Sequence, residues 1–319
     1  MERAWAVLVF GDTLAKKISV ERAHAWADSV GKAAQARGDR ATVATAQIWH
    51  GQRYGCYEFE YAKALPYFPP AIATARALRD DYGLARGLRE WAYAAQLAGE
   101  LETAKKHYTE LVRVARRGGY TELEGMAHWG LGGMAKSDGR YPDARRELDA
   151  ARRQLPAGTF RNVHAYFLYG EVLNRTGQRD EARRVFEDVL VEAKRLKNRF
   201  LTAAALNDLG IIAFEQGDMA AADRNWEIAA AHFDTLALKN NDRGSAINTR
   251  TNRAHALMIR GRLDEAQSLL ERQVQLAGQL DNPEIRLGTM GALGFLQRRA
   301  GHPVQAERTA RSVRSAWTE

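Results

Sequence analysis

The sequence contains a single cysteine and only seven prolines among its 319 residues. The lone cysteine, Cys56, has no partner for an internal disulfide, which suits a reducing compartment and leads us to expect a cytoplasmic protein. Alternating runs of Val, Ile and Thr around hairpin turns are also missing, so a β-sheet architecture is excluded. No apolar run approaches the roughly 18 residues that a membrane helix needs, and we expect no membrane partner.

Residue patterns of catalytic and cofactor sites are missing as well. The sequence has no glycine-rich phosphate loop, no HExxH, no GxSxG and no CxxC. Its eight histidines are scattered, and none pairs with a second at helical metal-ligand spacing. Cys56 lies near His50, but a nucleophilic cysteine also needs an orienting group and a pocket. We therefore expect no enzyme activity, no metal and no cofactor.

What the sequence does contain is a recurring pattern of small residues, clearest between Trp129 and Pro156. Gly132 lies inside an apolar helical stretch, Gly139 follows seven residues later in a turn, and Ala144 follows five residues after that. Small residues at these positions allow two helices to touch, because larger side chains would push them apart. The pattern resembles the tetratricopeptide repeat, a helix–turn–helix unit with this arrangement of Gly, Ala and Pro.

The same three marks, a small residue, a turn and an alanine, recur along the whole chain. They are Gly11, Ile18 and Ala23; Gly51, Glu58-Phe59 and Ala64; Ala92, Gly99 and Ala104; Gly132, Gly139 and Ala144; Gly170, Gly177 and Ala182; Gly210, Gly217 and Ala222; Ala254, Gly261 and Ala266; and Gly294, Gly301 and Ala306. Successive first marks lie 38 to 44 residues apart, longer than the ordinary unit of about 34 residues. Long repeats of this kind are similar to those of kinesin light chains and bacterial signalling proteins.

The resemblance implies an all-α fold, a right-handed α-solenoid of about eight helical hairpins, in one domain over residues 1–319. The expected repeats are approximately 4–40, 44–80, 85–120, 125–156, 163–198, 203–240, 247–282 and 287–318. The apolar start of the chain is interpreted as the first helix rather than as a signal peptide.

Two segments depart from the pattern. Pro66, Pro69 and Pro70 fall where a second helix is expected, and proline is tolerated only in a helix's first turn. We expect that helix to start late, near Pro69, either as a local kink without a role or as a hinge. The polar segment Asn240 to Ser245 predicts a longer connection between repeats six and seven.

In the family, the first helices of the repeats line a concave groove. Carrying its groove positions over to this sequence gives a set of polar and aromatic residues: Arg86, Arg89, Tyr93, Gln96, Trp129, Lys136, His164, Phe167, Glu171, Asn174, Asn207, Glu215, Asn248, His255, Phe295 and Arg298. Aromatic anchors beside arginine and asparagine suit a bound peptide. The alternative is that Trp129, Phe167 and Phe295 fill a tightly wound superhelix.

Basic doublets follow the marker alanine in three consecutive repeats. They are Lys105, Lys106, Arg145, Arg146, Arg183 and Arg184. On the convex side they would form a positive ridge for nucleic acid or an acidic partner. The simpler interpretation is a solvated helix face balanced by nearby carboxylates such as Asp143 and Glu147.

These patterns together predict a scaffold or sensor that binds a protein or peptide in its groove without catalysis. One alternative is the regulatory repeat region of a larger bacterial signalling enzyme or transcription regulator, and a second is binding of nucleic acid or an acidic partner through the ridge. No polar helix follows repeat eight, so self-association through that end is also expected.

Overall fold

The computed structural model describes residues 19–240 and 243–318, and within them the chain is helical with no strand. It divides into two compact units, Met1–Ala157 and Gly158–Glu319. The marks expected at Gly11 and Ile18, and most of the first predicted helix, lie outside the described residues.

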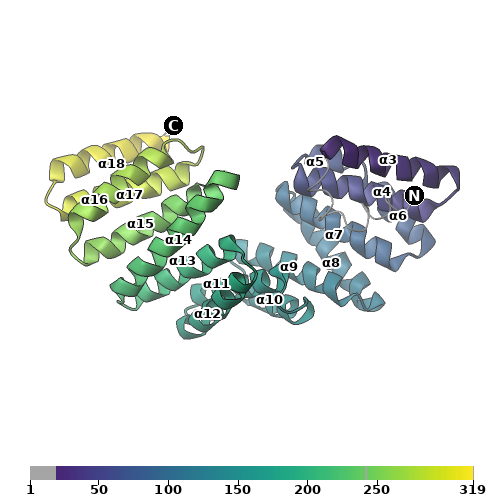
Figure 1. Cartoon of the computed structure of the whole chain (residues 1–319), viewed down its shortest axis with the longest axis horizontal. Helices are drawn as coiled ribbons and strands as arrows, with labels where there is room; N and C mark the ends of the chain where they lie inside the picture. The colour runs from purple at the N-terminus through teal and green to yellow at the C-terminus, as the bar shows by residue number, and fades with distance from the viewer. Residues whose placement is uncertain (1–18, 241–242, 319) are drawn as a thin grey trace. The chain divides into compact units, whose positions relative to one another are not determined.

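The first unit is a series of helices that pack against their neighbours in the sequence (Figure 1). Its helices are α3 (Val20–Ala36), α4 (Arg40–Gln52), the π-helical turn η2 (Arg53–Tyr57), α5 (Tyr61–Ala64), α6 (Phe68–Leu78), α7 (Asp81–Leu97), α8 (Leu101–Gly118), α9 (Thr121–Ser137) and α10 (Tyr141–Gln154). We call α4, α7 and α9 first helices and α3, α6, α8 and α10 second helices.

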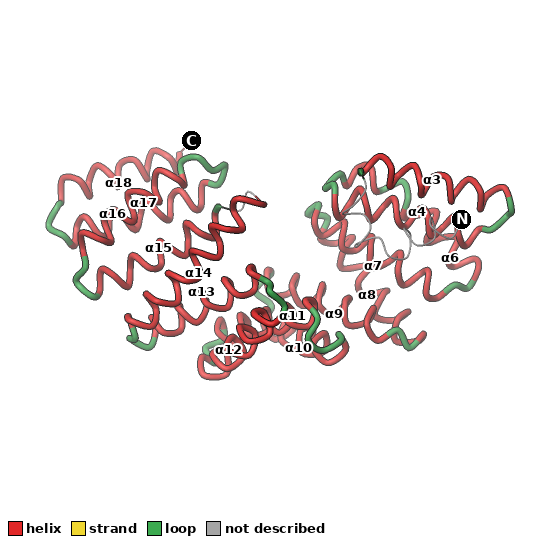
Figure 2. The backbone as a smooth tube through the Cα atoms, viewed as in Figure 1, coloured by secondary structure: helices red, strands yellow, loops and turns green. Residues whose placement is uncertain are grey.

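The second unit repeats this arrangement, with short loops between its helices (Figure 2). Its helices are α11 (Phe160–Arg175), α12 (Arg179–Arg195), α13 (Arg199–Glu215), α14 (Met219–Asn240), α15 (Gly244–Ile259), α16 (Leu263–Ala277), α17 (Pro283–Arg299) and α18 (Pro303–Thr318). Here α11, α13, α15 and α17 are the first helices. The fold class predicted from the sequence, an all-α solenoid of helical hairpins, is confirmed.

The small residues of the repeat pattern lie where the two helices of a hairpin touch. A Cβ added at Gly132 would lie 2.6 Å from Cγ of Leu148, and one added at Gly170 would lie 2.8 Å from the ring of Phe186. Helices this close leave no space for a methyl group. The sequence-based explanation of these positions is therefore confirmed.

The turns within the hairpins also lie where the pattern places them. Gly139 has φ +72°, a left-handed conformation that favours glycine, and the following N–H of Arg140 donates to the carbonyl of Ala135 at 2.9 Å. In the second repeat Phe59, with φ +58°, occupies the turn in place of glycine.

The proline-rich second helix begins late, as predicted. After the short α5, helix α6 starts at Phe68 and carries Pro69 in its first turn, where the missing N–H is harmless. The expected long connection at Asn240–Ser245 is wrong in part. Helix α14 runs to Asn240 and α15 begins at Gly244, three residues before the expected start of repeat seven. Asn240, Gly244 and Ser245 are therefore helix-end residues, whereas residues 241–242 lie outside the described part of the chain.

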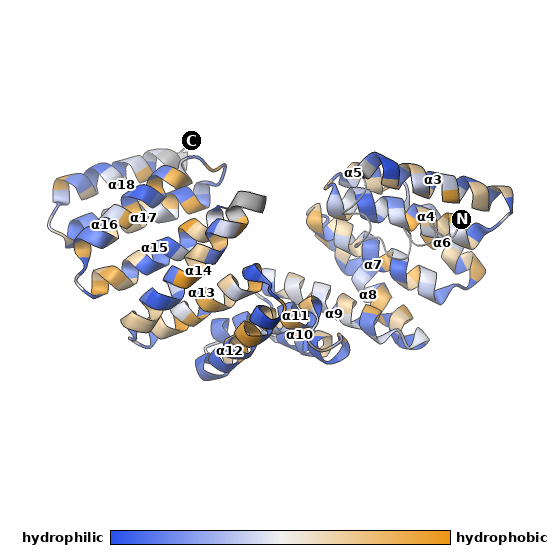
Figure 3. Cartoon of the chain, viewed as in Figure 1, coloured by the Kyte–Doolittle hydropathy of each residue, from blue (hydrophilic) through white to orange (hydrophobic). Residues whose placement is uncertain are grey.

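Each unit buries its apolar residues between successive hairpins. Leu88 and Leu111 are fully buried in the first unit, and Phe186 and Leu201 are fully buried in the second. Figure 3 shows hydrophobic and hydrophilic residues interspersed along the helices of both units. One stripe of each helix is thus used in packing, and the remaining faces are available for a site.

Candidate peptide-binding surface of the first helices

Four predicted groove residues lie on α7 at spacings of three, four and three residues. All four, Arg86, Arg89, Tyr93 and Gln96, are half-buried. Gln96 is held by the neighbouring second helix, because Oη of Tyr108 donates to its Oε1 at 3.0 Å. The spacing places them on one face of the helix.

Arg89 is anchored by the adjacent carboxylate of Glu90, with Nη2 2.5 Å from Oε1. Burial has the largest single effect and lowers the pKa of Arg89, but Glu90 and the smaller effects of Cys56, Tyr108 and Tyr57 together outweigh it, so the pKa of this guanidinium is raised. Arg89 is therefore a fixed positive charge at the edge of the α7 face.

Cys56 contacts the same region from η2, with Sγ 4.0 Å from the carbonyl oxygen of Glu90. Burial raises the pKa of the Cys56 thiol well above its usual range, and Glu90 adds to this effect. A nucleophilic cysteine needs the opposite shift, toward the thiolate. Cys56 thus packs as a neutral thiol.

On α9, Trp129 and Lys136 are half-buried. They lie at positions that correspond to Arg89 and Gln96 on α7, one repeat earlier. The mark between them, Gly132, is buried against α10. The structure therefore places large side chains beside the hairpin contact rather than in it.

In the second unit, Phe167 requires a correction. Its side chain lies on α11 with only 6% exposed, and its ring centroid is 5.6 Å from that of Phe186 on α12. It belongs to the core with Leu201, so the aromatic anchor predicted here is a packing residue. His164, Glu171 and Asn174 on the same helix are half-buried.

Two further predicted residues are held in contacts between helices. The backbone carbonyl of Asn207 accepts from Nε1 of Trp226 at 3.1 Å, and the side-chain Oδ1 of Asn207 accepts from Oγ1 of Thr249 at 3.3 Å. Glu215 is exposed and accepts from Nε of Arg179 at 2.5 Å. Both side chains therefore stabilise the stack of helices.

The remaining groove residues lie on α15 and α17. Asn248 is exposed, and His255 is half-buried with a pKa lowered by burial. Phe295 is 47% exposed, and the guanidinium carbon of Arg298 lies 5.9 Å from its ring centroid. This is the most open aromatic side chain of the predicted set.

Sequence reasoning missed two residues that extend the α17 face. A Cβ built on Gly288 or Gly291 meets nothing within 4 Å. Gly291 and Phe295 line a cavity of about 490 Å³ between α17 and α18. The sequence signal for this face was the spacing of Gly288, Gly291 and Phe295 by three and four residues, which places two glycines on the helix face that carries Phe295.

The basic doublets are exposed, apart from the half-buried Arg183. Arg146 pairs with Asp143 at 3.0 Å and with Glu147 at 3.2 Å, as the simpler interpretation expects. Lys105 and Arg146 line a cavity of about 330 Å³ between α8, α9 and α10. A continuous ridge over three repeats stays a prediction.

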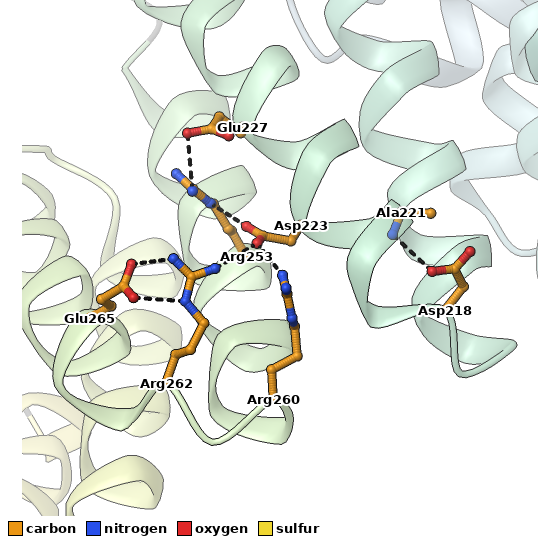
Figure 4. A network of polar contacts seen from close by, with 8 residues as sticks. All are labelled: Asp218, Ala221, Asp223, Glu227, Arg253, Arg260, Arg262 and Glu265. Carbon is orange, nitrogen blue, oxygen red and sulfur yellow. Dashed lines mark hydrogen bonds and ion pairs between the residues drawn. The ribbon is translucent and has the colours of Figure 1, made fainter.

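An ion cluster around one buried carboxylate in the second unit has no sequence signal (Figure 4). Asp223 of α14, with its side chain 8% exposed, accepts from Nε of Arg253 at 2.7 Å. It also accepts from Nη1 of Arg260 at 2.6 Å and from Nη1 of Arg262 at 3.2 Å. Glu227 pairs with Arg253 and Glu265 pairs with Arg262. Three carboxylates thus balance three guanidinium groups, which makes this cluster a connection between helices.

No group of three or more His, Cys, Asp or Glu side chains is arranged to hold a metal ion in residues 19–240 and 243–318. In the same residues, none of the helices combines the length and the apolar character required to span a membrane.

Comparison with known proteins assigns the class. Residues 162–225 match the sequence profile of the tetratricopeptide repeat family, and the solved structures that resemble this chain are solenoids of such repeats. The protein therefore has a tetratricopeptide-repeat fold. None of the curated protein sequences matches the chain.

The similar solved structures include bacterial sensors. The apo form of the quorum sensor NprR from B. thuringiensis is 13% identical, with 99% of this chain and 97% of that chain covered and a TM-score of 0.63. NprR in complex with its cognate peptide NprX is 15% identical, with 98% and 86% covered and a TM-score of 0.57. Aspartyl phosphate phosphatase F from Bacillus subtilis is 12% identical, with 96% and 79% covered and a TM-score of 0.60. At these identities the likeness concerns the fold.

Proposed function

We propose that this protein is a recognition module that binds a peptide or an extended protein segment along its first helices. One observation carries the proposal. On α7 and α9, large half-buried side chains such as Tyr93 and Trp129 lie beside the marks Ala92 and Gly132, which are buried. Small residues make the helix contacts, so the larger aromatic and cationic groups are not needed to fill them.

The chemistry of this face suits a peptide. Tyr93 and Trp129 offer apolar area with a polar edge, and Arg86 and Arg89 offer donors for carbonyl or carboxylate groups. NprR, whose fold this chain resembles, is known in complex with a peptide. That structure supports the proposal by showing that a repeat stack of this kind can hold a peptide.

We further propose that the role is one of binding without catalysis and that the protein acts in the cytoplasm. The raised pKa of Cys56 supports the first part, because a protonated thiol is a weak nucleophile. The single cysteine supports the second, because it cannot form an internal disulfide.

A peptide-display selection on the purified full chain tests the proposal. We expect a selected peptide whose affinity falls at least about tenfold in Tyr93→Ala and in Trp129→Ala, the loss typical of a central aromatic anchor. Lys106→Ala on the exposed face of α8 is the matched control and should leave the affinity unchanged. Circular dichroism of each variant excludes unfolding. A selected peptide that binds both aromatic variants as tightly as the wild type would contradict the assignment.

A further inference from the structure

The second unit contains a cavity of about 510 Å³ between α14, α15 and α16. Two of these three helices are second helices, and none of the lining residues belongs to the predicted groove set. Ile247 of α15 and Leu269 and Leu276 of α16 supply apolar walls. An apolar cavity of this size with a few polar groups has the character of a ligand site.

The polar lining of the cavity is strongly positive. Arg243, Arg250 and Arg272 contribute three guanidinium groups, and Asp234 contributes the single carboxylate. Asp234 forms a two-point ion pair with Arg250, in which Nη1 lies 2.9 Å from Oδ1. Arg272 is exposed, and no carboxylate of the described residues lies within ion-pair distance of it. The lining therefore has an excess of two positive charges.

One residue of the cavity lining, Gln273, has a buried acceptor that lacks a donor. The Gln273 side chain lines the cavity and is 1% exposed, and its Nε2 donates to the carbonyl of Leu269 at 3.3 Å. Its Oε1 is buried without a hydrogen-bond partner. A buried acceptor of this kind is destabilising unless a donor reaches it, by about 1–3 kcal/mol.

We propose that this cavity binds an acidic residue of a peptide together with an apolar neighbour. The carboxylate accepts from Arg272 and shares the positive field of Arg243, the apolar side chain packs on Ile247 and Leu269, and a peptide N–H donates to Oε1 of Gln273. The Gln273 contact selects a peptide over a simple organic acid, because an ionised carboxylate has no donor to offer. The protein thereby gains a second contact point, made by residues other than the predicted groove residues, for an acidic segment of a partner.

Titration of the full chain with two capped tripeptides tests this proposal. The probes are acetyl-Leu-Glu-Leu-amide and acetyl-Leu-Gln-Leu-amide, followed by amide chemical shifts or calorimetry. We expect saturable binding of the glutamate peptide and at least about tenfold weaker binding of the glutamine peptide, since the charge-assisted hydrogen bonds are lost. Arg272→Gln should weaken the glutamate peptide by a similar factor.

Two further variants separate the contacts. Gln273→Met keeps the length of the side chain and removes the acceptor, so it should weaken the glutamate peptide while leaving isovalerate, a carboxylate without an N–H, unaffected. Arg184→Gln removes the same charge from the exposed face of α12 and should have no effect. Equal affinity for the two peptides, full binding by Arg272→Gln, or no saturable binding at millimolar peptide would each overturn the proposal. The Tyr93 and Trp129 variants should leave this binding unchanged, so the two sites are tested independently.

Discussion

At the scale of single residues, the helix contacts depend on positions that tolerate no side chain. A Cβ on Gly210 would lie 2.6 Å from Nε1 of Trp226, whose ring is buried and held by its hydrogen bond to Asn207. The ring cannot move away without losing that bond. Gly288 on α17 has the opposite surroundings, with nothing within 4 Å of its added Cβ.

Gly210→Ala and Gly288→Ala should therefore change stability in opposite directions. Alanine favours a helix over glycine by about 0.5–1 kcal/mol, and Gly288→Ala should gain that amount. Gly210→Ala should lose about 1–2 kcal/mol net, because overpacking outweighs the same helix preference. Urea unfolding of both variants measures the difference. Equal midpoints for the two variants would show that the contact at Gly210 is loose.

The role of some single residues could be predicted from the sequence, and the role of others could not. Gly132, Gly139 and Gly210 could be assigned to contacts and turns because each repeat uses them in the same way. The burial of Phe167 could not be predicted. Phe167 occupies the repeat position of the half-buried Trp129, but its side chain packs against the large ring of Phe186. Exposure depends on the neighbouring side chain, which the repeat pattern does not determine.

At the scale of helices, Asp223 connects α14 to α15 and to the start of α16. Asp223→Asn keeps the shape of the side chain but removes the charge that three arginines share. We expect a loss of about 2–4 kcal/mol in the free energy of unfolding. This is near the low end for buried pairs, because the three arginine side chains are 21%, 35% and 37% exposed.

Glu307→Gln is the control for that substitution. It breaks the exposed pair with Arg311, one turn apart on α18, and pairs of this kind contribute about 0.3–0.5 kcal/mol. Urea unfolding and amide hydrogen exchange in α15 and α16 measure the effect. If both variants unfold at the same urea concentration, the Asp223 cluster does not stabilise the unit.

Some helix boundaries follow from the local sequence, and others follow from packing against distant helices. The late start of α6 follows from the chemistry of proline and could be predicted. The end of α14 at Asn240 agrees with the expected end of repeat six. The start of α15 at Gly244 rather than at residue 247 could not be predicted, because local polarity favours a turn there whereas packing against α14 and α16 supports a longer helix. Asp223 joins arginines that lie 30 to 39 positions further along the chain, beyond the range of any local pattern.

At the scale of the whole molecule, each unit contains buried or half-buried histidines that resist protonation. Burial lowers the pKa of His50, His107 and His255, although Asp28 partly opposes this at His50. In the unfolded chain, histidines take up protons near pH 6.5. Below that pH the unfolded state binds more protons than the folded state, so the free energy of unfolding falls as the pH falls.

We therefore expect the protein to be less stable at about pH 5.5 than at about pH 7.5. Carboxylates do not account for a loss in this window, because Glu147, bonded to His128, has a lowered pKa and its contribution disappears only below about pH 4.5. The measurement is urea unfolding at a series of pH values. His107, buried and stacked on Trp91 with ring centroids 4.1 Å apart, supplies the discriminating variant. His107→Gln should lower stability at neutral pH but reduce its slope with pH, since one uncharged histidine no longer titrates. A slope that is unchanged in this variant, or stability that rises toward pH 5.5, would mean that the buried histidines are not the groups that set the pH dependence.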